Sequence, residues 1–342
     1  MKSIPKLNNN ICVVTVTYGN RFEYLKTITH SALNQGVKKV FVVDNNSDIE
    51  STKKVDIFSQ ELNNEIKLIR LDSNTGSANG FKIGIENAIK DFEFIWLLDD
   101  DNNPEDGALD VLVDFWNESY NQGDILSLAS FRKGWDSFRN SVITGNPDGP
   151  VSPINGFRDF HVLEYLKKIW FKIMPVKLKE IKKSNLSFGE LSVVPYGGMF
   201  FNSELINEIG FPNSDYYLYH DDYEFSHRIK KNGGKIILLL KSTIESLEDS
   251  WHIQSKGPEF YKLSRINDDV RLYYQIRNKL VFEKNEIVSR KWIYFINMVV
   301  FSLFFLVSCL LFLNINNIPI YFVAIFDGLC VKMGKHPKFS YS

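Results

Sequence analysis

The sequence has few cysteines and no excess of charge of either sign. Its 342 residues include 3 cysteines, and 40 Lys and Arg nearly balance 41 Asp and Glu, for a formal net charge of −1. Cys12, Cys309 and Cys330 form no CxxC pair and have no metal-ligand spacing, so we expect buried thiols in a reducing compartment. The charge balance argues against a binder that relies on overall positive charge, and no nucleic-acid partner is expected.

Two common nucleotide motifs are also missing. The chain has no GxGxxG, which counts against a dinucleotide cofactor, and no GxxxxGK[ST], which counts against a P-loop ATPase. Residues 1–10 are polar and lack the apolar core of a signal peptide, so we expect no export of the amino-terminal part.

What the sequence does have is an apolar run that leads directly into three carboxylates. Residues 94–98 read as a strand buried on both faces, and Asp99, Asp100 and Asp101 follow at its carboxyl end, where ligands bind in an open α/β sheet. Adjacent carboxylates repel one another unless a cation lies among them, and hard oxygen ligands suit Mg²⁺ or Mn²⁺. Asp99 and Asp101 are therefore predicted to clamp a metal and a diphosphate. The alternative is an acidic turn before a helix that starts at Pro104.

Apolar segments alternate with helical patterns through the first part of the chain. Strands are expected at residues 11–17, 40–43, 66–71, 94–98 and 125–131, with helices between them. This alternation predicts an α/β fold with a mostly parallel sheet, flanked by helices and joined by right-handed crossovers.

Polar or small residues follow the early strands as well. Asp44 after the second strand is typical of a hydrogen-bond acceptor for a ribose or base, although it could instead cap a turn. Asn74, Gly76 and Gly80 after the third strand would let backbone amides approach a phosphate or sugar. Together these strand ends predict a nucleotide site.

A second acidic cluster lies among aromatic residues. Asp221 and Asp222 fall within the aromatic-rich stretch 216–225. A helix dipole alone would favour such carboxylates, but aromatic faces also cover the apolar side of a sugar ring, and a carboxylate there can accept a proton from a hydroxyl. The glycine-interrupted strand at Gly197 and Gly198 suits a substrate that approaches the backbone. His252 is a candidate third metal ligand, or else a structural histidine.

The C-terminal part changes character. Residues 292–313 carry no charge and would form a helix of about 33 Å, followed by a polar break and a second apolar run at 318–326, with lysines or arginines on both sides. We expect a helical hairpin that lies on or dips into one leaflet; a single span comes second, and a buried helix pair of a soluble dimer third. The basic, aromatic stretch 165–183 could rest on an anionic membrane, form a lid, or be a solvated helix face.

With both acidic clusters in view, the chain resembles a family 2 glycosyltransferase of the GT-A fold, and within it the bacterial rhamnosyltransferase and galactofuranosyltransferase branch. The likeness covers about residues 11–130 and 195–335. It rests on motifs in order at residues 16–21, 43–47, 74–81, 98–104, 220–225, 251–252 and 273–278.

The resemblance implies roles for individual residues. The nucleotide would be bound by Thr17, Tyr18, Arg21, Asp44, Asn46, Asn74, Gly76, Asp99 and Asp100. Mn²⁺ or Mg²⁺ would be held by Asp99 and Asp101, with His252 as an additional ligand. Asp222 would be the catalytic base and Asp221 its acceptor-binding neighbour, while Gly197, Gly198 and Trp251 would lie at the donor or acceptor sugar.

The implied activity is a single inverting displacement from a UDP- or dTDP-sugar, galactofuranose first and rhamnose second. A lipid-linked or growing cell-surface glycan would be the acceptor, at the cytoplasmic face of the cell membrane, and an oligomer is possible. The expected divisions are a nucleotide-sugar-binding half (1–131), an insertion that acts as a lid or faces the membrane (132–190), an acceptor-binding and catalytic half (191–283) and a membrane-associated helical segment with a basic tail (284–342). Two alternatives stay open, a sugar nucleotidyltransferase and a catalytically silent glycan-binding scaffold.

Overall fold

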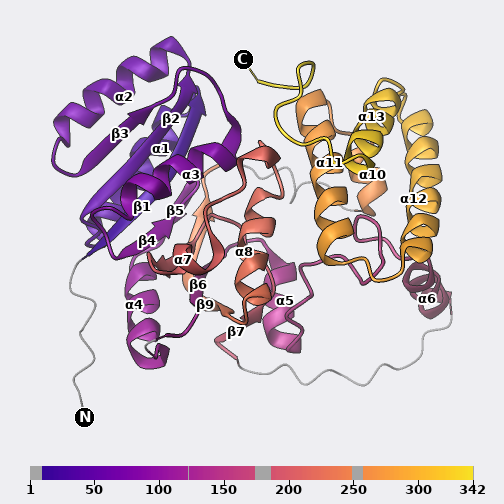
Figure 1. Ribbon diagram of the computed structural model, residues 1–342, viewed down its shortest axis with the longest axis horizontal. Helices are drawn as coiled ribbons and strands as arrows, with labels where there is room; N and C mark the ends of the chain where they lie inside the picture. The colour runs from indigo at the N-terminus through magenta and orange to yellow at the C-terminus, as the bar shows by residue number, and fades with distance from the viewer. Residues whose placement is uncertain (1–9, 122, 174–185, 249–256, 342) are drawn as a thin grey trace.

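The computed structural model describes residues 10–121, 123–173, 186–248 and 257–341. A central sheet with helices on both faces is built by residues up to Ser246, and a bundle of helices beside it is built largely by residues from Glu259 onward (Figure 1). The site-bearing loops lie between these two parts.

The amino-terminal half of the sheet is parallel, as expected. Its strands, in the order β3-β2-β1-β4, are β1 (Ile11–Gly19), β2 (Lys39–Ser47), β3 (Ile66–Arg70) and β4 (Phe94–Leu97). The connecting helices are α1 (Phe22–Asn34), α2 (Ile49–Glu61) and α3 (Gly76–Ala88). Parallel neighbours need a crossover rather than a tight turn, so all four carboxyl ends meet at one edge of the sheet.

The other half of the sheet is mixed, and the sheet as a whole agrees with the expected α/β fold with a mostly parallel sheet. Its strands are β5 (Asn102–Pro104), β6 (Leu126–Arg132), β7 (Phe188–Leu191), β8 (Met199–Asn202) and β9 (Lys235–Ser246). β8 runs antiparallel between β4 and β6, and β5 and β7 run antiparallel to β9. The residue pattern of a short apolar strand does not indicate whether the strand pairs parallel or antiparallel, because such a strand is buried on both faces in either case.

Helices cover this half too, and one of them begins later than the sequence suggested. They are α4 (Ala108–Ser119), α5 (Asp136–Thr144), α7 (Leu205–Ile209), the 3-10 turn η1 (Ser214–Tyr216) and α8 (Asp221–Lys231). The chain at Pro104 is still a strand, paired with Ile244 of β9, and the helix after it begins at Ala108. α8 begins at Asp221, so both carboxylates of the second acidic cluster belong to its first turn.

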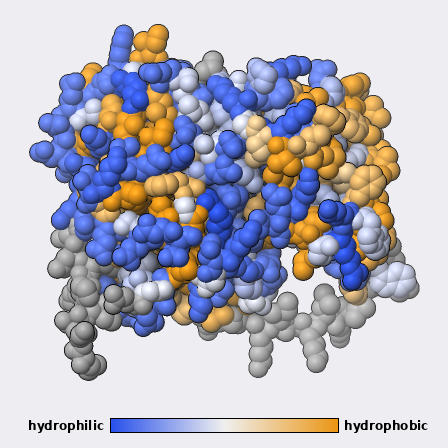
Figure 2. Space-filling view, in the orientation of Figure 1, coloured by the Kyte–Doolittle hydropathy of each residue, from blue (hydrophilic) through white to orange (hydrophobic). Residues whose placement is uncertain are grey.

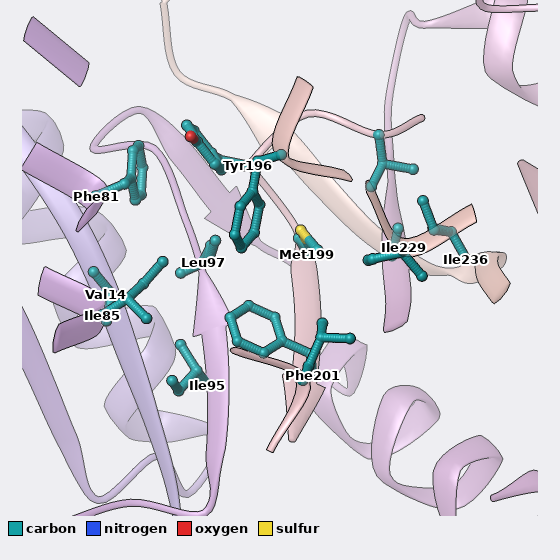
Figure 3. Packing of buried hydrophobic residues seen from close by; sticks show 14 of the residues in the cluster. Val14, Phe81, Ile85, Ile95, Leu97, Tyr196, Met199, Phe201, Ile229 and Ile236 are labelled. Atoms are coloured by element: carbon teal, nitrogen blue, oxygen red, sulfur yellow. The ribbon is translucent and has the colours of Figure 1, made fainter. Parts of the chain in front are cut away.

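Apolar side chains pack on both faces of the sheet. On one face Val14 of β1 and Leu97 of β4 meet Phe81 and Ile85 of α3 and Phe201 of β8 (Figure 3). On the other face Trp96 is fully buried among residues from α1 and α4. Removing a buried aromatic side chain of this size costs about 3–5 kcal/mol, so the strand that carries the acidic cluster is firmly held.

The helical bundle has its own apolar core. It contains α6 (Val162–Ile173), α10 (Glu259–Leu263), α11 (Asp269–Glu286), α12 (Lys291–Leu311) and α13 (Asn317–Leu329). α11 packs against α13, and α10 against α12. By length and composition α12 could cross a membrane, although part of it is buried against the rest of the protein.

Candidate active site

Two carboxylates of the first acidic cluster, Asp99 and Asp101, lie beside the guanidinium of Arg132. Arg132, at the end of β6, places Nη1 3.7 Å from Asp99 Oδ2 and Nη2 3.3 Å from Asp101 Oδ2. Two carboxylates that share one cation direct oxygens toward a common point. Desolvation raises the pKa of Asp99 to about 6, the charge of Asp101 adds to the rise, and Arg132 opposes it. Asp99 and Asp101 are therefore turned to the same side.

Asp100 points elsewhere and anchors the end of the first strand. Its carboxylate accepts hydrogen bonds from Thr17 Oγ1 at 2.8 Å and Arg21 Nε at 2.9 Å. Arg21 also lies over the rings of Tyr18 and Tyr24, at 5.4 and 5.2 Å. Four of the predicted nucleotide residues, Thr17, Tyr18, Arg21 and Asp100, thus form one contact network, while Tyr18 stays 42% exposed and accessible to a ligand.

The second acidic cluster lies at the start of α8. Asp221 is buried and its Oδ2 accepts a hydrogen bond from Ser77 Oγ of α3 at 3.0 Å. Burial raises the pKa of Asp221 to about 7 and the pKa of Asp222 well above its ordinary value. The charge of Asp99 contributes to both rises, and because Coulomb interactions weaken with distance, the two acidic clusters lie within electrostatic reach of each other.

The loop before α8 has an uncommon backbone. Tyr217, Tyr219 and His220 all have positive φ, at 63°, 65° and 60°. Each non-glycine residue in this region costs about 1–2 kcal/mol, so surrounding contacts must hold the loop. One contact comes from Gly76, where a Cβ atom would lie 1.9 Å from Tyr217 O. Only glycine allows α3 to approach the loop so closely.

The edge formed by β2 and β3 is organised by an asparagine. Asn45 accepts a hydrogen bond from Thr75 N at 2.9 Å and donates to Gly76 O at 3.1 Å. Asn74 Oδ1 accepts from Gly76 N at 3.0 Å. Asp44 is fully buried; it accepts from Ser47 N at 2.9 Å and from Arg70 Nε at 3.1 Å, so the turn contact that the sequence left open does exist.

The remaining predicted residues have varied surroundings. Asn46 is exposed with a φ of 63°. A Cβ on Gly197 would lie 2.7 Å from Asp99 Oδ2, and Gly198 donates its N–H to Leu97 O at 2.8 Å, so these glycines bring the β8 backbone against the acidic strand end. Trp251 and His252 lie outside the described residues.

The residues at the first acidic cluster fit a divalent cation. In the described parts of the chain, no group of three or more His, Cys, Asp and Glu side chains converges on a metal position. The donor chemistry is nevertheless suitable, because Asp99 and Asp101 present hard oxygens to one positive partner. Asn102 Oδ1, buried beside Gly197, has no hydrogen-bond partner among the described atoms and adds another oxygen of the same kind.

Sequence reasoning missed three residues of this site. Arg132 is the first residue of the predicted insertion, yet a cationic residue directly after the predicted strand 125–131 was an available signal. Asn45 lies inside a noted motif. Ser77 has no signal of its own, because its contact with Asp221 spans 144 positions of the chain.

Comparison with known families identifies the amino-terminal part. Residues 12–179 match the sequence model described as Glycosyl transferase family 2. Residues 12–179 therefore carry the sequence signature of glycosyl transferase family 2. Comparison with curated protein sequences finds no match.

Several solved structures are similar in fold. A crystal structure of GalNAc-T7 with UDP, GalNAc and Mn²⁺ is 15% identical, with 80% of this chain and 48% of that chain covered and a TM-score of 0.54. The mannosyltransferase PcManGT from Pyrobaculum calidifontis, in complex with GDP-Man and Mn²⁺, is 12% identical, with 96% and 76% covered and a TM-score of 0.53. S. aureus TarS is 15% identical, with 93% and 90% covered and a TM-score of 0.47.

At these identities the likeness shows the fold. The chain has the GT-A fold, a mixed α/β architecture with a mostly parallel central sheet, and the matched part covers 48% of the GalNAc-T7 chain.

Proposed function

We propose that this protein is a family 2 glycosyltransferase that transfers a sugar from a UDP- or dTDP-sugar to a glycan acceptor with inversion and with the help of Mn²⁺ or Mg²⁺. The observation that carries the proposal is the approach of two carboxylate clusters from different parts of the chain. Asp99 acts electrostatically on Asp221 and Asp222, although more than a hundred residues separate them in sequence.

The donor would lie at the edge where β1, β2, β3 and β4 end. Thr17, Tyr18 and Arg21 would line it on one side, and Asp44, Asn46, Asn74 and Gly76 on the other, with Asp100 holding Arg21 in place. Asp99 and Asp101 would hold the metal ion, which when bound neutralises negative charge on the departing nucleoside diphosphate. His252 and Trp251 stay predictions as a further ligand and a sugar contact.

Asp222 is the proposed general base. Its raised pKa makes the carboxylate a stronger proton acceptor than an exposed aspartate. As the acceptor hydroxyl attacks the anomeric carbon, the new C–O bond forms, the bond to the diphosphate oxygen breaks, and the hydroxyl proton passes to Asp222. Asp221, fixed by Ser77, would orient the acceptor, with Gly197 and Gly198 leaving room for a sugar beside it.

The acceptor we propose is a lipid-linked glycan at the cytoplasmic face of the membrane. Apolar side chains of α12 such as Trp292, Leu303 and Leu311 are 64%, 57% and 73% exposed. Hydrophobic residues are visible over α12 and α13 on the right side of Figure 2. The opposite face of α12 is tied to the protein, since Asn297 donates to Asn155 O at 2.8 Å. This contact favours a helical hairpin that lies on one leaflet over a single span across the membrane.

The donor is proposed from the family branch that the sequence resembles, UDP-galactofuranose first and dTDP-rhamnose second. A thermal-shift screen of nucleotide sugars with and without Mn²⁺ tests it, because a donor that binds the folded state raises its apparent stability. We expect stabilisation that requires the metal ion.

The base assignment is tested with Asp222→Asn. This variant should bind UDP and Mn²⁺ as the wild type does and should lose transfer. Wild-type transfer rates in D222N would refute the assignment. If the wild-type protein showed metal-dependent binding without turnover on any lipid-linked acceptor, the result would favour a silent glycan-binding protein.

A further inference from the structure

Two adjacent residues of α11 hold the loop that leads into the second acidic cluster. Asn278 is fully buried, and its Nδ2 donates to three main-chain carbonyls, those of Tyr216 at 2.8 Å, Leu218 at 2.7 Å and Tyr219 at 2.9 Å. Arg277 Nη2 donates to Tyr216 O at 3.1 Å, and Arg277 Nε donates to Asn278 Oδ1 at 2.8 Å. The two side chains and the carbonyls form one network.

The network acts where the backbone most needs support. Residues 216–220 run directly into Asp221 and Asp222, and Tyr217, Tyr219 and His220 hold left-handed φ angles that isolated residues rarely adopt. From the other side α3 contributes a hydrogen bond from Ala78 N to Tyr217 O at 3.3 Å. The loop is thus fixed between α3 and α11, and the direction in which α8 begins depends on both.

A purely structural role would leave the contact pattern unexplained. α11 already has apolar anchors, such as Leu272, Ile276 and Leu280, all fully buried. Burying an amide and a guanidinium is costly unless every polar group finds a partner, and here the partners are concentrated on one short segment. Such a polar network fixes one conformation of the segment rather than stabilising the fold as a whole.

Arg277 also joins the loop to the C-terminal tail. Its Nη1 donates to Gly334 O at 2.7 Å, and Gly334 N donates to Asp215 O at 2.6 Å. The next residue, Lys335, donates from Nζ to Asn74 O at 3.0 Å, at the edge where the nucleotide is proposed to bind. One side chain therefore links α11, the loop and the segment after α13.

We propose that Arg277 and Asn278 are positioning residues for Asp222. They touch no reacting atom, and they act by holding the backbone of residues 216–220 so that the carboxylate of Asp222 faces the first acidic cluster. This role rests on the proposed function of Asp222 as the base.

The test variant is Asn278→Asp. Aspartate has the same shape and still accepts from Arg277, but it turns an oxygen instead of an NH₂ group toward the three carbonyls. The matched control is Asn297→Asp on α12. Asn297 is equally buried, accepts from Val162 N at 2.9 Å and donates to Asn155 O, away from the loop. Both variants, made in the full chain, replace the NH₂ group of one buried asparagine with an oxygen.

Hydrogen exchange of the protein without substrate is the first measurement. Peptides covering residues 216–224 should exchange at least about tenfold faster in N278D than in the wild type, and at the wild-type rate in N297D. If N278D does not fold, Arg277→Lys serves as the second variant; it keeps a cation near the Tyr274 ring but lacks the planar fork whose separate nitrogens bond Gly334 O and Tyr216 O. Unchanged exchange of these peptides in the folded variant would overturn the proposal.

Turnover separates positioning from general damage. With UDP-galactofuranose, Mn²⁺ and a lipid-linked acceptor, N278D should lower kcat by roughly 100-fold and leave the donor KM within about twofold. In the D222N background N278D should not lower the residual turnover further, because its effect passes through Asp222. An equal loss in both backgrounds, or in N297D, would overturn the positioning role while leaving the proposed function intact. Wild-type turnover in D222N would instead refute the proposed function, whatever the exchange shows.

Discussion

Replacing Glu283 with glutamine should remove a pH dependence of folding stability. Glu283 is a buried residue of α11 whose Oε1 accepts from Ser152 Oγ and from Arg158 N at 2.9 Å, and whose Oε2 accepts from Tyr294 Oη at 3.0 Å. Desolvation raises its pKa from 4.5 to about 7, against the opposing charges of Lys279 and Arg158. Below about pH 7 the carboxyl therefore joins residues of the 132–190 segment to the bundle in its protonated form.

The pH dependence of the free energy of unfolding follows from the difference between the pKa values of Glu283 in the folded and unfolded protein. A carboxyl whose pKa is higher in the folded than in the unfolded protein favours folding below pH 4.5, and this contribution is lost as the pH rises to about 7. That difference corresponds to about 3 kcal/mol at most. Glutamine keeps the oxygen that accepts from Ser152 and Arg158 and can donate to the Tyr294 hydroxyl, so E283Q should keep the fold.

Urea unfolding at pH 5 and pH 8 measures the effect. The free energy of unfolding of the wild type should fall by about 2–3 kcal/mol more than that of E283Q between these pH values. Glu190→Gln, on the exposed part of β7, is the control for loss of one negative charge and should follow the wild type. Equal changes in wild type and E283Q would show that Glu283 is ionised in the folded protein, and the reasoning would be refuted.

Three further predictions concern the site and the surface. Gly76→Ala should lower the free energy of unfolding by at least about 3 kcal/mol and weaken UDP binding in calorimetry, because its Cβ would overlap Tyr217 O. Gly107→Ala, at a similar φ of +80° but in open space, should lower it by only about 1 kcal/mol, and equal losses in the two variants would contradict the argument. Arg132→Gln should enlarge the Mn²⁺-induced rise in Tm, because the carboxylates of Asp99 and Asp101 lose their shared cation; an unchanged or smaller rise would exclude this competition. Leu303→Glu on α12 should reduce co-flotation with anionic phospholipid vesicles at least about tenfold, whereas Ile57→Glu, 58% exposed on α2, should not; equal flotation of both would argue against α12 as the docking surface.

The sequence was informative wherever the signal was local. The apolar run at 94–98 predicted β4 and the placement of Asp99 and Asp101 on a common side, because a buried strand has a short, recognisable pattern and alternates its side chains. The same pattern could not tell that β8 runs antiparallel between β4 and β6, or that Pro104 pairs with β9 instead of starting a helix. Strand direction and pairing depend on the path of the whole chain.

The amino-acid sequence by itself determined the helices and strands of the amino-terminal half, the two groups of carboxylates and the apolar C-terminal helices. Each of these features depends on residues that are close to one another in the sequence. Only the tertiary structure decided that Arg132 lies between Asp99 and Asp101, that Ser77 holds Asp221, and that Asn278 fixes the loop before α8. These contacts join residues 31 to 144 positions apart, and their geometry is set by how the sheet and the helical bundle pack together.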